Sequence, residues 1–535
     1  MIFNRLLSVP YESAFTVARP LQNRFQPMFS APSVRFIRAS IRHLRTFSGR
    51  VAPVALAAAL ALPSPSTLHA AETVLTLDDA IRFALEKNPQ IKVDAFNRSI
   101  ARADLLTQRG RFDPALAFRR SYAEDGAPAS QNPLVAQLIK TDDYSLALEG
   151  TTPWGMNYSL GGSANNQRHP LTGYTDSYAT FGGITVTQPL LRGFGFGPNL
   201  VGVRIAKADR GIADWLFRQT VIDTVTQVAI AYSDVAYAQQ QLRIAQRSRE
   251  LAAGLLAENE KRFSVGSMSE SDVTQARART ATRDEAILYS EQALRDSVNY
   301  LRQLMGETSF AIEPENLVVN PPDIPDDLVI RPAEDLQKAY DDRPDFQAAR
   351  LGIVKRRATH ASERNQLLPQ VDFVGSYGYS GLDRDFGVSR RMVANNDNRS
   401  YSAGVVVRVP LTFAEGRGRA RSARLRLHQA EADLQLLEQE IAASIARAAG
   451  QIETTRRRVA ANRAAHDLAR EALDAELKKL RAGTSNTFFV LQQQEEVSRA
   501  ENNLYRALAD QRRAVAAYDR ELGRTLVTRN IVLEQ

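Results

Sequence analysis

The sequence predicts an α+β membrane protein: a transmembrane β-barrel continued by a long α-helical barrel, built from two internal repeats and closed by association of identical copies. The order helix, strands, long helical hairpin occurs twice along the chain, which indicates a duplication. Each hairpin turns at a single glycine, Gly266 in the first and Gly483 in the second. Between the helices, apolar residues alternate with small or polar ones, as in strands with one apolar face.

The N-terminal segment, residues 1–71, predicts an export leader. Residues 1–70 hold eight arginines and one acidic residue, and an apolar run follows the last arginine at residues 51–62. Small residues then allow cleavage after Ala70 or Ala71. The apolar run is too short to span a bilayer. Residues 71–535 carry a net charge of only about +1, which argues against nucleic-acid binding. The chain has no cysteine, which excludes disulfides and thiolate metal sites.

Repeat 1 is predicted over residues 72–313 and opens with a helix over residues 77–112. Thr76 is suited to cap this helix, and Asp79 follows three residues later, a variant of the capping box. Pro89 is expected to break or kink the helix after Asn88, because the residue before a proline disfavours the helical conformation. Pro114 is expected to end the helix.

Strands are predicted over residues 115–189, where the apolar spacing changes from about 3.6 to 2. Tyr144, Leu146 and Leu148, for example, alternate with small or polar residues. Between the X-Pro landmarks that flank the strands, this segment (114–189) is much longer than its counterpart in the second repeat (369–410). One additional hairpin around residues 153–155 would fill that length. We expect it in or beside the sheet, which then has six strands per chain instead of four.

A long helical hairpin is predicted over residues 200–305, with its turn at Gly266. Its first arm is about 95 Å long at 1.5 Å per residue. Heptad spacing predicts one packing stripe on this arm: Val221, Val225, Val228, Tyr232, Val235 and Leu242. At the turn, glycine suits the positive φ that ends a helix, and the Ser, Thr and Asn residues that follow suit the N-cap of the returning helix.

The same order then recurs. Residues 314–332 are rich in proline and acidic residues and predict a linker. Repeat 2 is predicted over residues 333–525. It comprises helices over 333–368, strands over 371–411 on either side of a polar loop at 383–400, and a helical hairpin over 417–522 that turns at Gly483. Residues 526–535 form a C-terminal tail.

Such a unit leaves open sheet edges and a half-apolar helical hairpin, so it needs a partner surface. Identical copies arranged by cyclic symmetry satisfy both requirements. Strands with one apolar face can cross a bilayer only as a closed barrel, because every backbone polar group must then be paired. With an export leader and no cysteine, the sequence therefore predicts an outer-membrane channel with a helical tunnel in the periplasm.

Several short motifs, in this order along the chain, resemble those of a known family: Leu77-Asp78-Asp79-Ala80-Ile81, Arg262-Phe263-Ser264-Val265-Gly266 and Arg481-Ala482-Gly483-Thr484. Over nearly all of residues 75–525 the chain resembles the TolC-type outer-membrane efflux proteins. The resemblance implies a homotrimer in the outer membrane of a Gram-negative-type bacterium, with the two turns at the periplasmic mouth. It further implies an exit duct of a tripartite efflux or type I secretion system, which a periplasmic adaptor protein joins to an inner-membrane transporter.

The resemblance also suggests functional residues at the turns. Gly266, Ser267, Gly483 and Thr484 are the candidate contacts with the adaptor. Asp272 matches a position that, in the family, bonds across to the neighbouring hairpin. As an alternative, Asp272 is a carboxylate favoured by the N-terminal helix dipole.

Three further positions correspond to the constriction of the channel in this family. Where family members often carry acidic residues after the second turn, this chain has Phe489 and Gln492, and Ser485 stands at a position that is Arg in some members. We expect an aromatic and amide collar with less cation selectivity than an acidic ring. In the alternative interpretation, Phe488 and Phe489 pack between helices.

No catalytic, cofactor-binding or metal-binding pattern is found, so we expect neither an enzyme nor a cofactor. The four histidines after the leader are scattered over different elements, and the glycines of residues 193–197 lack the Lys-Ser/Thr of a phosphate loop. A coiled-coil scaffold without a transport role is the main alternative, because the long helices alone would also fit it.

Overall fold

The computed structural model describes residues 73–126, 138–169, 173–308, 317–321, 324 and 329–533, which belong to one compact unit, Leu68–Gln535. The predicted leader lies outside the described residues. The helices are α1 (Leu77–Lys87), α2 (Pro89–Gly110), α3 (Phe196–Asn199), α4 (Val201–Ser264), α5 (Glu270–Leu304), α6 (Pro332–Asp342), α7 (Pro344–Asn365), α8 (Phe386–Ala394), α9 (Ala414–Arg481), α10 (Thr487–Glu521) and α11 (Thr525–Thr528). The strands are β1 (Thr73–Leu75), β2 (Ala115–Gly126), β3 (Leu138–Thr151), β4 (Asn157–Arg168), β5 (Tyr178–Pro189), β6 (Leu317–Val319), β7 (Gln370–Asp383) and β8 (Asn398–Arg408).

The first helical segment is divided in two at Asn88. The hydroxyl of Thr76 accepts a hydrogen bond from the backbone N–H of Asp79 at 3.1 Å and donates one to the Asp79 carboxylate at 2.7 Å, which confirms the predicted cap. The side chain of Asn88 caps α2 by accepting from the N–H of Gln90 at 2.8 Å. Pro89 then opens α2, a position where no N–H is needed.

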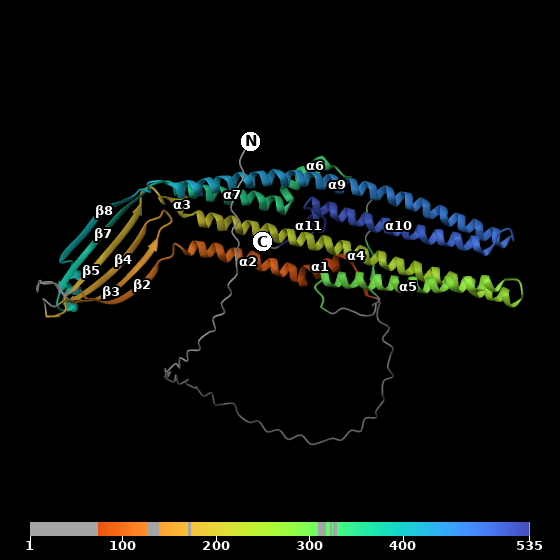
Figure 1. The fold of residues 1–535 in the computed structure, drawn as a ribbon, viewed down its shortest axis with the longest axis horizontal. Helices are drawn as coiled ribbons and strands as arrows, with labels where there is room; N and C mark the ends of the chain where they lie inside the picture. Colours follow the sequence, from red (N-terminus) through yellow and green to blue (C-terminus); the bar gives the residue numbers. More distant parts are fainter. Residues whose placement is uncertain are drawn as a thin grey trace, which may run out of the picture. The chain divides into compact units, whose positions relative to one another are not determined.

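The large sheet has six antiparallel strands in the order β2-β3-β4-β5-β7-β8 (Figure 1). Four of them come from residues 115–189 and two from residues 370–408. The hairpin β3–β4 lies within the sheet, so the additional length of the first strand segment adds strands. β5 pairs with β7, which joins the two halves of the chain. β2 and β8 are the two edges.

One face of this sheet carries a continuous exposed apolar row. Consecutive strand pairings align six side chains across the sheet: Leu116, Leu148, Leu160, Ile184, Tyr377 and Tyr401. All six are exposed. On the opposite face, Gly183 lies beside Gly378, and a Cβ at either position would overlap the backbone of the neighbouring strand. Glycine is required there because the two backbones approach so closely.

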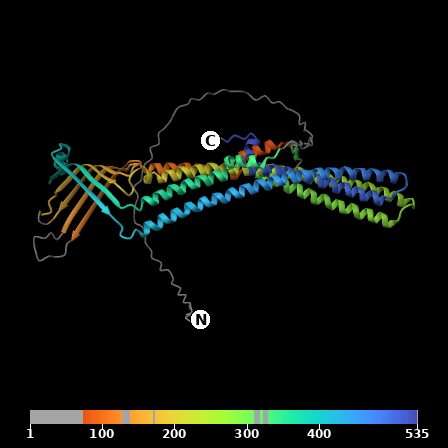
Figure 2. The same ribbon diagram turned by 90° about the horizontal axis from the view of Figure 1, so that it is seen from above.

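The long helices continue from the sheet and pack side by side (Figures 1 and 2). Next to the sheet the neighbouring pairs are α2–α4, α4–α7 and α7–α9; towards the turns they are α5–α4, α4–α10 and α10–α9. Each of these layers therefore has two outer helices, α2 and α9 in the first and α5 and α9 in the second. Within the described residues, no helix is both long and apolar enough to cross a bilayer.

The predicted heptad stripe of α4 forms the centre of one hydrophobic core. Val221, Val225, Val228 and Val235 are almost completely buried, which confirms the packing register. Tyr232 lies in the same stripe, and its hydroxyl donates to the carbonyl of Leu75 at 2.7 Å. A second core gathers α6, α7, α9 and α10 around buried residues that include Ile441, Ile445 and Tyr518.

Three segments differ from the sequence-based predictions. The predicted linker, residues 314–332, contains β6, which pairs in parallel with β1; its residues 314–316, 322–323 and 325–328 lie outside the described residues. The predicted polar loop, residues 383–400, contains α8, and the tail predicted over residues 526–535 continues α11 with a buried Leu526. Such short elements contain too few turns or alternations for a reliable period.

α8 is held on the sheet by polar contacts that no local pattern predicts. The hydroxyl of Ser389 is buried and donates to the carbonyl of Tyr178 at 2.9 Å, while Thr180 donates to the carbonyl of Ser389 at 3.1 Å. Phe386 packs edge-on against Tyr178. Ser389 is far from both hydrogen-bond partners in the sequence, so α8 depends on the assembled sheet.

Candidate functional site at the two helical turns

The first turn closes α4 with a left-handed glycine. Gly266 has a φ of +75°, and its N–H donates to the carbonyl of Phe263 at 2.9 Å. The N–H of Ser267 donates to the carbonyl of Arg262 at 2.9 Å, and the Ser267 hydroxyl reaches the same carbonyl at 3.0 Å. These bonds form a Schellman motif, which satisfies carbonyl groups that a helix end leaves unpaired.

The second turn has the same construction. Gly483 also has a φ of +75°, its N–H donates to the carbonyl of Leu480 at 3.1 Å, and the N–H of Thr484 donates to that of Lys479 at 3.0 Å. The Thr484 hydroxyl contacts the Lys479 carbonyl at 3.2 Å. A Cβ on Gly266 or Gly483 would meet no atom within 4 Å. The two tips are therefore exposed, and the described part of the chain packs nothing against them.

The start of the returning helix is capped locally in both hairpins. Ser269 caps α5, and its hydroxyl donates to the carboxylate of Asp272 at 2.6 Å. Asn486 caps α10 by accepting from the N–H of Phe489 at 3.2 Å. Asp272 is thus held within its own helix in this chain; its predicted bond to a neighbouring hairpin remains a prediction.

Ser485 bonds within the chain, and Gln492 lies on the wall of a groove. The Ser485 hydroxyl donates to Glu476 of α9, and Lys479 pairs with the same carboxylate at 3.0 Å. The hydrogen bonds from Ser485 and Lys479 lower the pKa of Glu476 below its ordinary value. Gln492 lines a groove of about 590 Å³ between α4 and α5 on one side and α10 on the other.

The two phenylalanines after the second turn differ in their surroundings. Phe488 lines the same groove, where the guanidinium of Arg279 lies 5.8 Å from its ring centre. Phe489 packs edge-on against Phe488 with ring centres 5.7 Å apart, and it is 48% exposed. Neither ring is buried between helices within this chain.

Ionic contacts join the two hairpins at this groove and beyond it, and no local sequence pattern predicts them. Arg283 of α5 pairs with Glu495 of α10, and Arg247 of α4 pairs with Glu501 at 3.4 Å. Farther from the turns, the Nε of Arg513 donates to Asp234 at 2.7 Å. In every pair the two partners come from different hairpins, and nothing in the local sequence marks them as pairs. Together they attach the second hairpin to the first.

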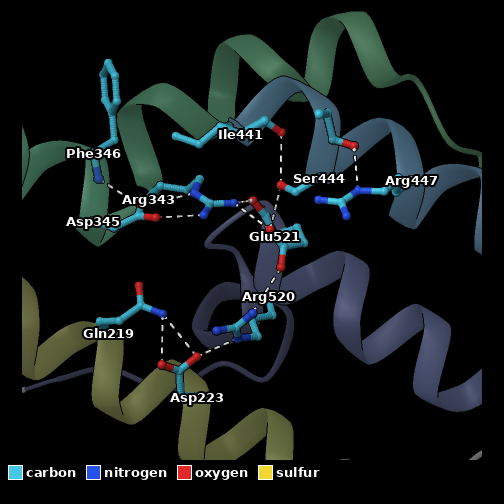
Figure 3. A network of polar contacts seen from close by, with 11 residues as sticks. Gln219, Asp223, Arg343, Asp345, Phe346, Ile441, Ser444, Arg447, Arg520 and Glu521 are labelled. Carbon is cyan, nitrogen blue, oxygen red and sulfur yellow. Dashed lines mark hydrogen bonds and ion pairs between the residues drawn. The ribbon is translucent and has the colours of Figure 1, made fainter. Parts of the chain in front are cut away.

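At the other end of α10, a partly buried polar network joins four helices (Figure 3). Arg343, between α6 and α7, donates to the backbone carbonyl of Glu521 at 2.7 Å and to its carboxylate at 2.8 Å. The remaining guanidinium nitrogens donate to Asp345 at 3.1 and 2.7 Å. Arg520, the neighbour of Glu521, donates to Asp223 of α4 at 2.6 Å. Ser444 of α9 also donates to Glu521, at 2.8 Å.

This network keeps its two central carboxylates ionised. Burial opposes ionisation of Glu521, but the hydrogen bonds from Arg343 and Ser444 outweigh it and lower the pKa of Glu521. Burial likewise opposes ionisation of Asp345, and its hydrogen bonds with Arg343 lower its pKa. Both carboxylates are charged at neutral pH, as the fork of Arg343 requires.

A matching junction lies at the equivalent place in the first half. Asn88 donates to the backbone carbonyl of Leu304 at 2.7 Å, as Arg343 does to Glu521. Two residues later in each case, Gly306 (φ +77°) and Gly523 (φ +70°) end the returning helix. A Cβ on Gly306 would lie 2.6 Å from the backbone of Lys87, so this close approach requires glycine.

The comparison with protein families decides how this arrangement is classified. The model of the family described as outer membrane efflux protein matches residues 80–307 and 336–524, which cover both strand segments and both hairpins. The chain belongs to the outer membrane efflux protein family. It is therefore an outer-membrane protein, and its relatives in the family are channel proteins.

Individual relatives agree with this assignment. The chain is 26% identical over 283 residues to outer membrane efflux protein BepC of Brucella suis biovar 1 (strain 1330), which covers 51% of this chain and 58% of BepC. It is 25% identical over 306 residues to cobalt-zinc-cadmium resistance protein CzcC of Cupriavidus metallidurans (strain ATCC 43123 / DSM 2839 / NBRC 102507 / CH34), over 56% of this chain and 68% of CzcC. The match to BepC thus spans little more than half of that protein.

Among solved structures, the outer-membrane channel OprN has a similar fold. The TM-score is 0.64 at 19% identity, with 84% of this chain and 89% of OprN covered. This likeness concerns the fold, in which the sheet and the long helices have a similar arrangement in both proteins.

Proposed function

We propose that this protein is the outer-membrane exit duct of a tripartite efflux or type I secretion system. In this proposal a homotrimer closes a transmembrane β-barrel and continues it as a periplasmic α-helical barrel. An inner-membrane transporter delivers the substrate and a periplasmic adaptor protein joins the two membranes. The observation that carries the proposal is that every layer of the chain ends in an open edge with exposed apolar residues.

These edges lie on the same two sides of the chain at each level. In the sheet, β2 and β8 are unpaired on one side within the described residues. Next to the sheet, α2 exposes Val93, Phe96 and Ile100, whose spacing of 3 and 4 places them on one stripe. On the other outer helix, α9, Leu425 and Leu436 are exposed.

The same holds towards the turns, where α5 exposes Leu288 and α9 exposes Leu468. The edge made of β2, α2 and α5 belongs to the first half of the chain, and the edge made of β8 and α9 belongs to the second. A head-to-tail contact between the two edges would generate a closed ring of copies. Three copies of the six-stranded sheet would give an 18-stranded barrel.

The two halves support an origin by internal duplication. The pairs Gly266 and Gly483, and Gly306 and Gly523, have similar positive φ angles and the same spacing along the sequence. The junction bonds of Asn88 and Arg343 go to carbonyls that are again separated by this spacing. When a structural unit is duplicated, the same turns and the same hydrogen bonds recur at a constant distance along the sequence.

The exposed apolar row of the sheet supports a lipid-facing surface. A protein in water rarely exposes an apolar row across six strands, whereas a membrane barrel places such side chains outwards. The opposite face, with its glycines and polar residues, suits a water-filled interior. A coiled-coil scaffold, the alternative interpretation, has no use for this sheet, and the family match also favours the channel.

The proposed trimer can be tested directly by introducing an aspartate on each of the two apolar edges. We expect Phe96→Asp, Leu425→Asp and the double variant to reduce the trimer in detergent, measured by light scattering after size-exclusion chromatography. Burying an unpaired carboxylate costs about 2 kcal/mol or more at each interface. Val265→Asp, on a 77% exposed residue at the first turn, is the matched control and should leave the trimer unchanged. Trimers of wild-type mass in all three edge variants would contradict the proposed interface.

The adaptor contact is tested at the turns themselves. A photo-crosslinking residue at Val265 or Ala482, each directly before the turn glycine, is expected to capture an exported periplasmic protein in intact cells. These neighbours are better positions than Gly266, Ser267, Gly483 and Thr484, because the glycines need a positive φ and the hydroxyls bond to the helix end. A crosslinker at exposed Arg456, in the middle of α9, is the control. Equal capture at all three positions would argue against an adaptor site at the tips.

The proposed collar of Phe489, Gln492 and Ser485 makes a prediction about ion selectivity. If Phe489 lines the entrance in the trimer, Phe489→Asp adds one carboxylate per copy and should raise the cation-to-anion permeability ratio several-fold in single-channel recordings. Phe489→Leu removes the ring without adding charge and should leave the ratio near the wild-type value. An unchanged ratio in Phe489→Asp channels would place this residue outside the conduction path.

A further inference from the structure

A second groove, of about 960 Å³, lies between α2, α4 and the C-terminal segment that follows α10. Its size falls in the range of pockets that hold small organic ligands. Five arginines line it: Arg98, Arg102, Arg109, Arg210 and Arg218. Asp214 is the one acidic residue among the described residues that line the groove. We call this surface the arginine groove.

The single carboxylate is shared by three of the arginines. The Nε of Arg98 lies 2.6 Å from Asp214, and Arg210 and Arg102 approach the same side chain at 3.7 and 3.9 Å. Among the described residues that line the groove, one carboxylate therefore faces five guanidinium groups. Such an excess of guanidinium groups is typical of a site for phosphate or carboxylate.

Arg218 provides a second observation. Its Nε is buried and has no hydrogen-bond partner among the described residues. The guanidinium lies over the ring of Trp215, 5.4 Å from its centre, which holds the side chain at the groove. A buried donor is usually paired in a folded protein. A small shift of the Arg218 side chain would bring this donor to an acceptor on a ligand in the groove.

The rest of the lining is apolar. Leu105 and Leu526 are buried, and Phe217 and Leu533 also line the groove. A free inorganic anion would make no use of these side chains, whereas a molecule with an acidic head and a hydrocarbon body would contact both parts. We propose that the arginine groove binds the phosphate headgroup of an anionic phospholipid, with part of an acyl chain on the apolar lining.

That the ligand is a membrane lipid rests on the proposed function, in which the sheet lies in the outer membrane. The ends of α2, α4, α7 and α9 nearest the sheet (98–110, 201–214, 352–365 and 414–427) together hold fifteen basic and five acidic side chains, a net charge of +10. Residues 71–535 as a whole carry only about +1. Positive charge is thus concentrated where the helices would leave the membrane. Such a position attracts anionic headgroups of the periplasmic leaflet.

The test is native mass spectrometry of the full-length detergent-purified protein with dioleoyl phosphatidylglycerol or dioleoyl phosphatidylcholine. We expect retention of phosphatidylglycerol to exceed that of phosphatidylcholine about tenfold. Arg102→Gln/Arg218→Gln should lose most of this preference, and Arg102→Lys/Arg218→Lys should keep part of it because the charge remains. The control Arg456→Gln/Arg463→Gln removes two exposed arginines of α9 and should bind as wild type.

Several outcomes would overturn the proposal. Equal retention of the two lipids would mean that the groove does not distinguish their headgroups. An undiminished preference for phosphatidylglycerol in the Gln variant would mean that Arg102 and Arg218 do not bind the headgroup. Displacement by excess inorganic phosphate would assign the site to a free anion. Melting by circular dichroism checks that the Gln variant folds, and the Lys variant serves if it does not. Since lipid retention is measured without a pump or an adaptor, it can succeed or fail independently of the crosslinking and conductance tests of the duct.

Discussion

Replacing Gly306 by alanine is expected to destabilise the protein far more than the same replacement at Gly266. The two glycines have nearly the same φ, +77° and +75°, so both replacements lose about 1–2 kcal/mol to left-handed strain. Only Gly306 lies against another segment: its Cβ would stand 2.6 Å from the backbone of Lys87, whereas that of Gly266 would meet nothing within 4 Å. We expect about 2 kcal/mol or more of additional cost for Gly306→Ala, because backbone atoms cannot rotate away.

The measurement is thermal unfolding of helical circular dichroism at one scan rate, with wild type and the two variants in the same detergent. The second hairpin supplies an independent pair, since a Cβ on Gly523 would lie 2.9 Å from the carbonyl oxygen of Asp342 and that on Gly483 would be free. Gly523→Ala should therefore melt below Gly483→Ala. Equal melting temperatures for all four variants would contradict this prediction, because close packing at the two junctions would then add nothing to the cost of replacing glycine.

Replacing Arg343 by methionine is expected to have the second large effect. Arg343 is largely buried and donates to Glu521 and Asp345 at once. Its loss would leave two carboxylates in a partly buried site without a cation, which costs about 3 kcal/mol, the lower end of the range for a buried pair. Arg331→Met is the control, because its pair with Glu334 is exposed and such pairs contribute less than about 1 kcal/mol. Equal denaturant midpoints for the two variants would contradict the importance of the network.

The same network predicts a sensitivity to acid. The pKa of Glu521 is lower in the folded protein than its ordinary value of 4.5, and that of Asp345 is lower than 3.8. The stabilisation is therefore complete above about pH 4.5 and is lost as the pH falls through the folded-state pKa values. Melting temperatures measured from pH 7 down to pH 3 should decline in wild type. In Arg343→Met this decline should be smaller, since protonation then relieves uncompensated charge.

Features that depend on a few neighbouring residues were predictable from the sequence. Thr76 and Asp79 form the predicted cap, the glycines at 266 and 483 have positive φ, and the stripe from Val221 to Val235 is buried. The alternation in residues 115–189 predicted strands, and the structure has four of them there. In each case the cause is local, because caps, turns and periodic stripes are set by residues within one or two turns of one another.

Pairings between distant segments were decided only by the tertiary structure. Arg343 finds its partner Glu521 in the last long helix, and Arg283 finds Glu495 in the other hairpin. β1 and β6 have too short a pattern to be recognised alone. The arginine groove exists only because α2, α4 and the C-terminal segment pack together. The sequence by itself determined the long helices, the strands of the large sheet and the two turns, because each has a local or periodic signal. The short elements β6, α8 and α11, and the contacts between distant segments, depend on how folding brings remote side chains into the same place.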